Sequence, residues 1–403
     1  MRRISATKLF VGAIAIVFGC NGRPVDSDDT PPANTDHPIP GPCEGAALEY
    51  GDVCFYPYSV EVMRYDHPLD LDGEPGHELV GVGDGKVSVH KWNGDGFVLL
   101  GEADLPGEVA ASVNAGVVAG EFDDVPGLDL VVAQSGEWVA LYHLTESGAP
   151  EFVSKTMMSG GYGFGRPVAV GPDDDGRWRV IAHFDNDDYV PSDHIALWEV
   201  QGTTFVDERL DLPIKTCSFE YCVGGDFNSD GRRDAICTLM DYCTDPGPEE
   251  DVAHIVFLAQ GDGSVAVEAY PSIGPPRFLA ADLDNDGFTD LVSTNMVRLG
   301  DGAGGLSAVI ANLDLPPSLR LRWSVVSIGD IDNDGNIDLL LGDYEHGVVY
   351  RDRVSDPGAF QSLTLNGGYE FGPYNRHVID VNGDGVIDLP VRNRGLLVSE
   401  VGP

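Results

Sequence analysis

The chain has 403 residues, a length that suits two or three ordinary domains or one large all-β domain. Acidic residues outnumber basic ones by 66 to 24, and the formal net charge of −42 argues against a nucleic-acid-binding surface or a basic patch for anionic lipid. With 42% hydrophobic residues, 51 Gly and 27 Pro, the composition favours a folded, turn-rich and β-rich protein over a disordered chain or a long helical bundle.

The first 19 residues have the pattern of an export signal. Three basic residues among residues 2–8 precede an apolar run, Leu9–Phe18, which is too short to span a bilayer. The run ends at Val17-Phe18-Gly19-Cys20, which resembles a bacterial lipobox, although Phe18 is bulkier than that pattern usually has. This resemblance implies a signal peptide over 1–19 and lipidation of Cys20; the alternative is an ordinary secretory signal cleaved nearby.

Residues 20–42 are expected to form an extended tether. The segment after Cys20 contains six prolines and almost no apolar side chains, so it cannot bury a core. At about 3 Å per residue it reaches on the order of 60 Å. The sequence therefore predicts an exported protein held away from a membrane by its lipid, at the bacterial outer membrane or cell surface. Asn21 after the cysteine favours the outer membrane, by resemblance to lipoprotein sorting signals.

Most of the chain after residue 50 is one repeat. Four nine-residue acidic segments align without gaps and begin at residues 226, 282, 330 and 380; weaker copies begin at 70, 121 and 171. Each segment lies between short apolar stretches, as in Ser324–Gly329 before the third strong copy and Asp338–Gly342 after it. Units of about 50 residues with four strands each are typical of propeller blades. We therefore predict a seven-bladed β-propeller of four-stranded antiparallel blades over 43–403; an open β-solenoid is the rival architecture.

The two ends of the repeat region complement each other. The last unit supplies strands at 377–380, 388–391 and 396–401 and then lacks a fourth, whereas the first unit is preceded by a spare stretch at 51–60. Part of this stretch is expected to fill the missing edge and so close the ring, which removes exposed strand edges.

The acidic segments have the composition of calcium loops. Carboxylate or amide oxygens stand at positions 1, 3, 5 and 9, position 6 is always Gly, and the carbonyl of position 7 can complete the shell. Ca²⁺ prefers six to eight oxygen ligands, including backbone carbonyls, whereas Mg²⁺ demands a stricter octahedron. An EF-hand is excluded, because position 12 is never Glu and a strand follows the loop. The predicted ligand sets are Asp226, Asn228, Asp230, Arg232 and Asp234; Asp282, Asp284, Asp286, Phe288 and Asp290; Asp330, Asp332, Asp334, Asn336 and Asp338; and Asp380, Asn382, Asp384, Val386 and Asp388.

This pattern resembles the FG-GAP and VCBS repeat family, the propeller of integrin α-subunit heads and of many bacterial surface proteins. Gly161–Gly171 is similar to the FG and GAP halves of that repeat. The resemblance covers roughly residues 50–403. It implies about four structural Ca²⁺ ions and a surface protein that acts in adhesion or envelope assembly.

The three weaker loops depart from the pattern. The first keeps Asp70, Asp72, Glu74 and Glu78 but has Pro75 in place of Gly, so its occupancy stays open. The second has Val125 and Pro126 at positions 5 and 6, and the third has Gly171 and Arg179 at positions 1 and 9; we expect neither to hold calcium. The alternative for all seven is that they are solvated acidic turns.

Six cysteines remain besides Cys20, an even number that suggests disulfides in an exported protein. Cys43–Cys54 is expected to be one bridge, because the other four cysteines cluster in the fourth unit. There the pairs Cys222–Cys237 and Cys217–Cys243 fit one antiparallel register; a zinc site built from these four is the alternative.

No compact catalytic motif is present: the sequence has no HExxH, no GxSxG and no P-loop. We therefore expect a non-catalytic, monomeric binding module for protein or glycan ligands. The alternatives are a propeller enzyme acting on polysaccharide as a lyase or hydrolase, and a purely structural envelope part. The longer loops 184–193 and 241–252 are candidates for ligand specificity, and His183 and His194 flank an acidic insert that is either a surface loop or a minor metal site. The five tryptophans either stack on sugars or fill the gaps between blades.

Overall fold

A computed structural model gives the architecture of this chain. The structure describes residues 43, 46–50, 53–58, 65–69, 76, 78–106, 115–134, 138–157, 167–182, 192–216, 219–239, 252–271, 278–284, 286–293, 296–306, 311–312, 324–342, 346–350, 361–364, 380–391 and 395–401. The predicted signal peptide, Cys20 and the tether lie outside these residues. Among the described residues no helix has the length and apolarity needed to cross a bilayer.

The described strands form seven four-stranded antiparallel sheets, which we number in the order of the sequence repeats. Sheets 1 to 4 consist of β3 (Tyr65–Leu69), β4 (Glu78–Gly83), β5 (Lys86–Trp92) and β6 (Phe97–Asp104); β7 (Ala115–Gly120), β8 (Asp129–Gln134), β9 (Trp138–Leu144) and β10 (Pro150–Met157); β11 (Val168–Val170), β12 (Arg179–Ala182), β13 (Ser192–Gln201) and β14 (Thr204–Thr216); and β15 (Phe219–Gly225), β16 (Asp234–Leu239), β17 (Val252–Ala259) and β18 (Val265–Pro271).

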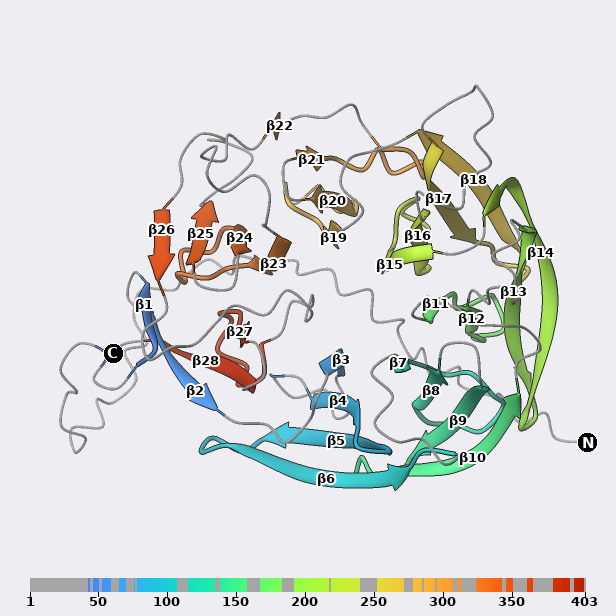
Figure 1. The fold of residues 1–403 in the computed structure, drawn as a ribbon, viewed down its shortest axis with the longest axis horizontal. Coiled ribbons are helices and arrows are strands. Elements are labelled where there is room, and N and C mark those ends of the chain that lie inside the picture. The colour runs from blue at the N-terminus through green and yellow to red at the C-terminus, as the bar shows by residue number, and fades with distance from the viewer. Residues whose placement is uncertain are drawn as a thin grey trace, which may run out of the picture.

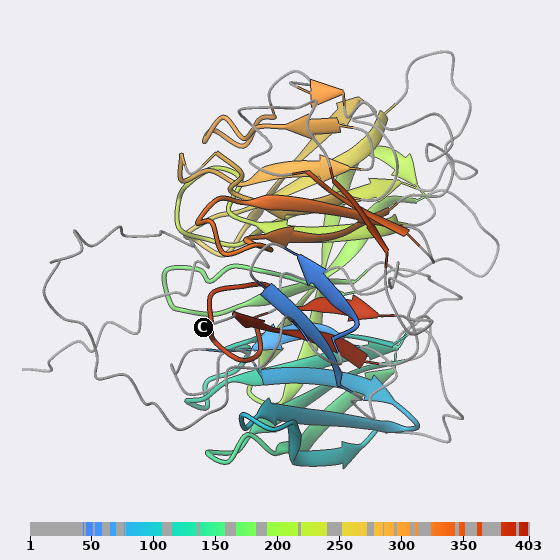
Figure 2. The same ribbon diagram turned by 90° about the vertical axis from the view of Figure 1, so that its left-hand side faces the viewer.

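Sheets 5 to 7 complete the set. They consist of β19 (Phe278–Ala281), β20 (Asp290–Ser293), β21 (Met296–Arg298) and β22 (Ala311–Asn312); β23 (Ser324–Gly329), β24 (Asp338–Gly342), β25 (His346–Tyr350) and β26 (Gln361–Thr364); and β27 (Leu389–Val391), β28 (Gly395–Val401), β2 (Val53–Tyr58) and β1 (Leu48–Tyr50). In Figure 1 the sheets stand around a common axis, and Figure 2 shows the same ring from the side. The prediction of an all-β propeller with four-stranded antiparallel blades is confirmed.

Sheet 7 joins the two ends of the described chain. β2 pairs antiparallel with β28 over six residue pairs, from Val53 with Val401 to Tyr58 with Leu396, and Figure 1 shows the blue strand beside the red one. The prediction that part of 51–60 fills the edge of the last unit is therefore confirmed. The strand predicted over 377–380 lies outside the described residues, except for Asp380.

The core lies between neighbouring sheets. Within the described residues the buried apolar side chains form seven clusters, and each cluster takes its side chains from two adjacent sheets; one unites Leu79 of sheet 1 with Leu396 and Val398 of sheet 7. Trp138 and Trp198 are buried in such clusters, which favours the role of these tryptophans as fillers between blades. Inner strands such as β8 and β16 are buried on both faces because both faces meet a neighbouring sheet.

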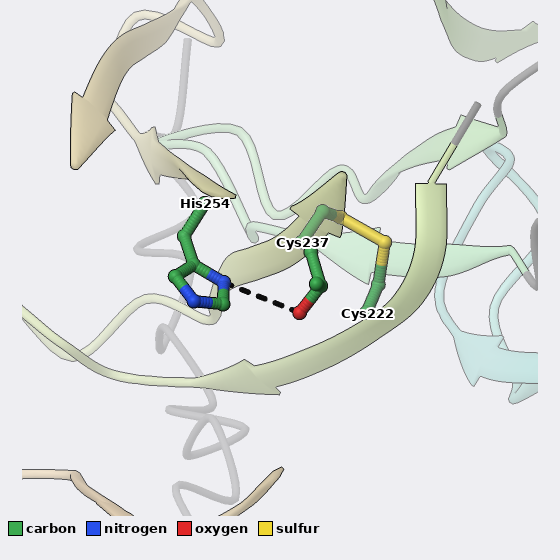
Figure 3. Close-up of a disulfide and its surroundings, with 4 residues drawn as sticks. Cys222, Cys237 and His254 are labelled. Atoms are coloured by element: carbon green, nitrogen blue, oxygen red, sulfur yellow. Dashed lines mark hydrogen bonds between the residues drawn. A yellow bond between two sulfur atoms is a disulfide. The ribbon is translucent and has the colours of Figure 1, made fainter. Parts of the chain in front are cut away.

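Two disulfides are present among the described cysteines, Cys43–Cys54 and Cys222–Cys237. Both pairings agree with the prediction, while Cys217 and Cys243 lie outside the described residues. Cys222 and Cys237 are direct cross-strand partners on β15 and β16. Figure 3 shows this bridge, with His254 of the next strand, β17, close by. The alternative of a zinc site built from Cys217, Cys222, Cys237 and Cys243 is wrong, because Cys222 and Cys237 are bonded to each other.

Candidate cation sites in the acidic loops

The four strong loops share a framework of bonds to their own backbone. In the sixth unit, Asp330 at position 1 accepts from the N–H of Asp334 at 3.1 Å and from that of Gly335 at 2.8 Å. The position-1 carboxylate therefore lies over the turn, where it faces the inside of the loop. The same two bonds recur at Asp226 and Asp282. Asp380 accepts from position 6 as well, but its other donor is Gly383 at position 4 instead of position 5.

The glycine at position 6 is required by the backbone. Gly335 has a φ of +84°, in the left-handed region that L side chains rarely adopt. Position 4 is left-handed as well where it is described: Ser229 has φ +59° and Asn333 +61°. In the sixth loop the positive φ values at positions 4 and 6 turn the chain tightly enough for the Asp334 carboxylate at position 5 to accept the N–H of position 7 at 2.9 Å. Position 5 makes this same bond in the other three strong loops: Asp230, Asp286 and Asp384.

Position 9 ties each loop to the strands beneath it. Asp234 is fully buried at the start of β16, and its two oxygens accept the N–H of Phe227 at 3.0 Å and of Ala259 at 2.8 Å. Phe227 stands at position 2 and is itself buried in the core between sheets 4 and 5. The acidic loop is thus anchored by an apolar side chain on one side and by a buried carboxylate on the other.

In the fifth and sixth loops the structure brings positions 1, 3 and 9 together. One carboxylate oxygen from each of Asp282, Asp284 and Asp290 lies within 4.8 Å of the others, and the corresponding trio of the sixth loop meets the same criterion: Asp330, Asp332 and Asp338. The position-5 carboxylates are not part of these trios. Three carboxylates so close together repel one another, and a hard divalent cation is the partner that suits them.

The sixth loop holds a carboxylate oxygen that lacks a partner. Asp338 is fully buried, and its Oδ2 accepts the N–H of Ile331 at 3.1 Å. Its Oδ1 is buried without a hydrogen-bond partner. A buried, unsatisfied carboxylate oxygen is unfavourable, so this atom fits a cation ligand.

Burial also acts on the protonation of position 9. It raises the pKa of Asp234, Asp290 and Asp338 to about 7, with the neighbouring carboxylates adding to the shift. The pKa of Asp388 is raised well above its usual value, again chiefly by burial. Ionisation of these groups is disfavoured because they are buried and lie near other carboxylates; the positive charge of a bound cation would favour the ionised form.

The fourth and seventh loops differ at position 3, where an amide replaces a carboxylate. Asn228 Oδ1 and Asn382 Oδ1 each accept the N–H of position 5 at 3.2 Å, so both amide oxygens are directed into the loop. Arg232 at position 7 of the fourth loop pairs through its side chain with Asp230 at 3.0 Å and with Asp174 of the third loop at 2.6 Å.

The described parts of the first and third loops contain ion pairs within the protein. Of the four acids predicted in the first loop, only Glu78 lies among the described residues; it is buried and lies 3.3 Å from the ammonium of Lys91. Asp70, Asp72 and Glu74 fall outside the described part of the chain. In the third loop Arg179 lies 3.2 Å from Glu199 and 3.6 Å from Asp173.

The second loop contains a group that could hold a metal, although the sequence analysis expected none there. His143 Nε2 lies 2.7 Å from Asp123 Oδ2 and 3.8 Å from Asp129 Oδ1. The repeat pattern did not single out His143, Lys91 or Glu199, because all three lie on the third strand of their unit rather than in the loop. Their common signal is the antiparallel register, which places each of them across from position 9.

Comparisons with known proteins identify no family for this chain. No protein-family model matches the chain, and no curated protein matches it. Among solved structures, it is similar to BBS1N in complex with ARL6DN (13% identity, TM-score 0.44, 85% of this chain and 94% of that one) and to the Dos1 propeller (12%, 0.41, 78% and 81%). It is also similar to Raptor of Chaetomium thermophilum, of which it spans 29% (10% identity, TM-score 0.49, 87% of this chain). At these identities and scores the matches carry no argument about function.

Proposed function

We propose that this chain is a seven-bladed, calcium-stabilised propeller of the FG-GAP and VCBS type. It would be held at a bacterial surface by a lipid on Cys20, and would serve as a non-catalytic module that binds a protein or glycan. The seven four-stranded sheets and the core clusters that link each sheet to the next support the closed ring.

The single observation that carries the calcium proposal is the sixth loop. Asp330, Asp332 and Asp338 bring three carboxylate oxygens within 4.8 Å of one another, and Asp338 Oδ1 is buried with no hydrogen-bond partner. Hydrogen bonds to the loop backbone therefore do not use all of the acceptor capacity of this trio. Oxygen ligands alone, with the position-7 carbonyl as a further candidate, suit Ca²⁺ better than Mg²⁺ or zinc.

The role in binding follows from the export features and from the architecture together. The two disulfides favour an oxidising compartment, in agreement with a signal peptide over 1–19. A rigid propeller on a tether presents its loops to large ligands. The sequence offers no compact nucleophile or acid–base motif that would favour the enzyme alternative.

The test removes one carboxylate from the sixth loop. We expect Asp332→Ala to lower the calcium bound per chain by about one ion, measured by equilibrium dialysis and elemental analysis of the full chain. The matched control is Asp175→Ala, an exposed aspartate at position 5 of the third loop, which is expected to leave bound calcium unchanged. Equal calcium in Asp332→Ala and the wild type would refute the site.

A further inference from the structure

The position-9 carboxylate of the second loop lacks a bond that three of the strong loops have. In the fourth, fifth and seventh loops one oxygen of position 9 accepts a backbone N–H from one residue beyond its register partner on the third strand: Ala259, Gly300 and Ser399. In sheet 2 Asp129 is paired with His143, so the equivalent donor is Leu144. The N–H of Leu144 bonds instead to the carbonyl oxygen of Leu128, at 3.0 Å.

Asp129 therefore uses one oxygen for the backbone and leaves the other for a different partner. Its Oδ2 accepts the N–H of Phe122 at 2.8 Å and that of Asp123 at 3.3 Å. Its Oδ1 accepts no hydrogen bond from the described residues and lies 3.8 Å from His143 Nε2. The side chain is only 2% exposed, so water compensates this oxygen little, and a buried carboxylate oxygen without a partner is unfavourable.

Asp123 at position 3 divides its two oxygens in the same way. Its Oδ1 accepts the N–H of Val125 at 2.8 Å, and its Oδ2 lies 2.7 Å from His143 Nε2. Both carboxylates thus keep one oxygen on the loop backbone and direct the other towards the same imidazole nitrogen. One ligand atom from each of Asp123, Asp129 and His143 lies within 4.8 Å of the others.

From this arrangement we propose that Asp123, Asp129 and His143 form a site for a divalent transition metal ion, of which Zn²⁺ fits best. One imidazole nitrogen with two carboxylate oxygens is a ligand set that zinc accepts. Ca²⁺ needs six to eight oxygens, and this loop has Val125 and Pro126 in place of the acid and the glycine of the strong loops. The site therefore takes a different class of metal from the proposed calcium loops and does not depend on them.

The three ligand atoms need only small shifts to reach the geometry of a zinc site. With bonds of about 2.0–2.1 Å, neighbouring ligands of a tetrahedral zinc ion are about 3.3 Å apart. The distances from His143 Nε2, 2.7 Å to Asp123 Oδ2 and 3.8 Å to Asp129 Oδ1, lie on either side of that value. Without metal, a proton lies between Nε2 and Asp123 Oδ2; a zinc ion takes its place and the proton leaves to solvent. The His143 side chain is 27% exposed, which admits the ion and leaves a fourth position for water.

The first test counts the zinc ions that the full chain binds. Equilibrium dialysis against zinc is carried out with about 10 mM calcium, which occupies the calcium loops. We expect His143→Gln to bind about one zinc ion fewer per chain than the wild type, because glutamine keeps a polar side chain of similar length without the imidazole nitrogen. The matched control is Asp124→Asn in the same loop, whose carboxylate is 71% exposed and pairs with Arg177. It is expected to bind as much zinc as the wild type.

A second measurement uses the wild type alone and does not depend on the folding of a variant. Crystals soaked in zinc chloride and measured on both sides of the zinc absorption edge are expected to show zinc-specific anomalous density among Asp123, Asp129 and His143. Zinc density only at other places, or equal zinc in His143→Gln and the wild type, would overturn the inference. Both results leave the calcium count, and with it the proposed function, unchanged.

Discussion

At the scale of single residues, position 9 of the four strong loops has a structural role and is also a candidate ligand. Its carboxylate accepts backbone N–H groups from position 2 and, in the fourth, fifth and seventh loops, from the third strand as well. In the fifth and sixth loops it also contributes an oxygen to the carboxylate trio. The acidic loop residues could be singled out from sequence as candidate ligands, because their spacing of two is set by the loop backbone. The partners on the third strand could not, because they lie at variable sequence distances and become neighbours only through strand register.

A second residue gives a pH-dependent prediction that does not involve the loops. His254 on β17 is fully buried, with Nδ1 3.2 Å from Thr238 Oγ1 and its ring against Phe278. Burial, with a smaller contribution from Arg298, lowers the pKa of His254 to about 3. The unfolded chain therefore takes up this proton first as the pH falls. Stability that is present above pH 6.5 is lost progressively on acidification towards pH 3.

We expect His254→Gln to remove this dependence. Between pH 6.5 and pH 5 the wild type should lose about 2 kcal/mol more than the variant in free energy of unfolding, at about 1.4 kcal/mol per pH unit. Urea unfolding at the two pH values, in the absence of calcium, measures the difference. Equal losses in both proteins would show that His254 does not contribute its proton to acid unfolding.

At the scale of elements, the acidic loop and the strand that follows it form the most predictable part of the fold. The apolar runs at 129–134, 234–239 and 338–342 were recognisable because they are buried on both faces. The edge strands were harder to place. β6 and β10 alternate between exposed and partly buried residues and carry apolar side chains on the surface, such as Leu99 and Phe152. Their sequences therefore carry a weaker signal.

The strand that completes sheet 7 gives the prediction at this scale. Phe55 on β2 is fully buried in the cluster that β1, β2 and β27 share with sheet 6. Phe55→Ala should lower the free energy of unfolding by about 3–5 kcal/mol, the usual range for a large buried aromatic residue. Phe152→Ala, at a phenylalanine that is 49% exposed on β10, serves as the control and should lose far less. Comparable losses in the two variants, measured by thermal or denaturant unfolding, would contradict the role of β2 in the core.

At the scale of the whole molecule, the net negative charge affects the stability of the folded ring. The chain carries a net charge of −42, and a compact fold concentrates that charge. Four bound Ca²⁺ ions would offset about 8 of those charges, at sites that lie on separate sheets around the ring. The sequence could predict the set of four-stranded sheets, because the repeat, the loop and the strand pattern have the same period.

Calcium should therefore stabilise the folded protein by specific binding. For a dissociation constant of about 1 mM, 10 mM calcium adds about 1.4 kcal/mol for each filled site. We expect a higher melting temperature in calcium chloride than in sodium chloride of the same ionic strength, because general screening is equal in the two salts. Identical melting temperatures would indicate that the acidic loops respond only to screening.

The most direct test of the central claim is the number of calcium ions bound per full-length chain, measured by equilibrium dialysis at millimolar calcium followed by elemental analysis. The calcium-loop account predicts about four ions, removable with EDTA and contributed by the loops that begin at residues 226, 282, 330 and 380. A chain that retains no calcium above the dialysis buffer would contradict it and leave seven solvated acidic turns on a propeller.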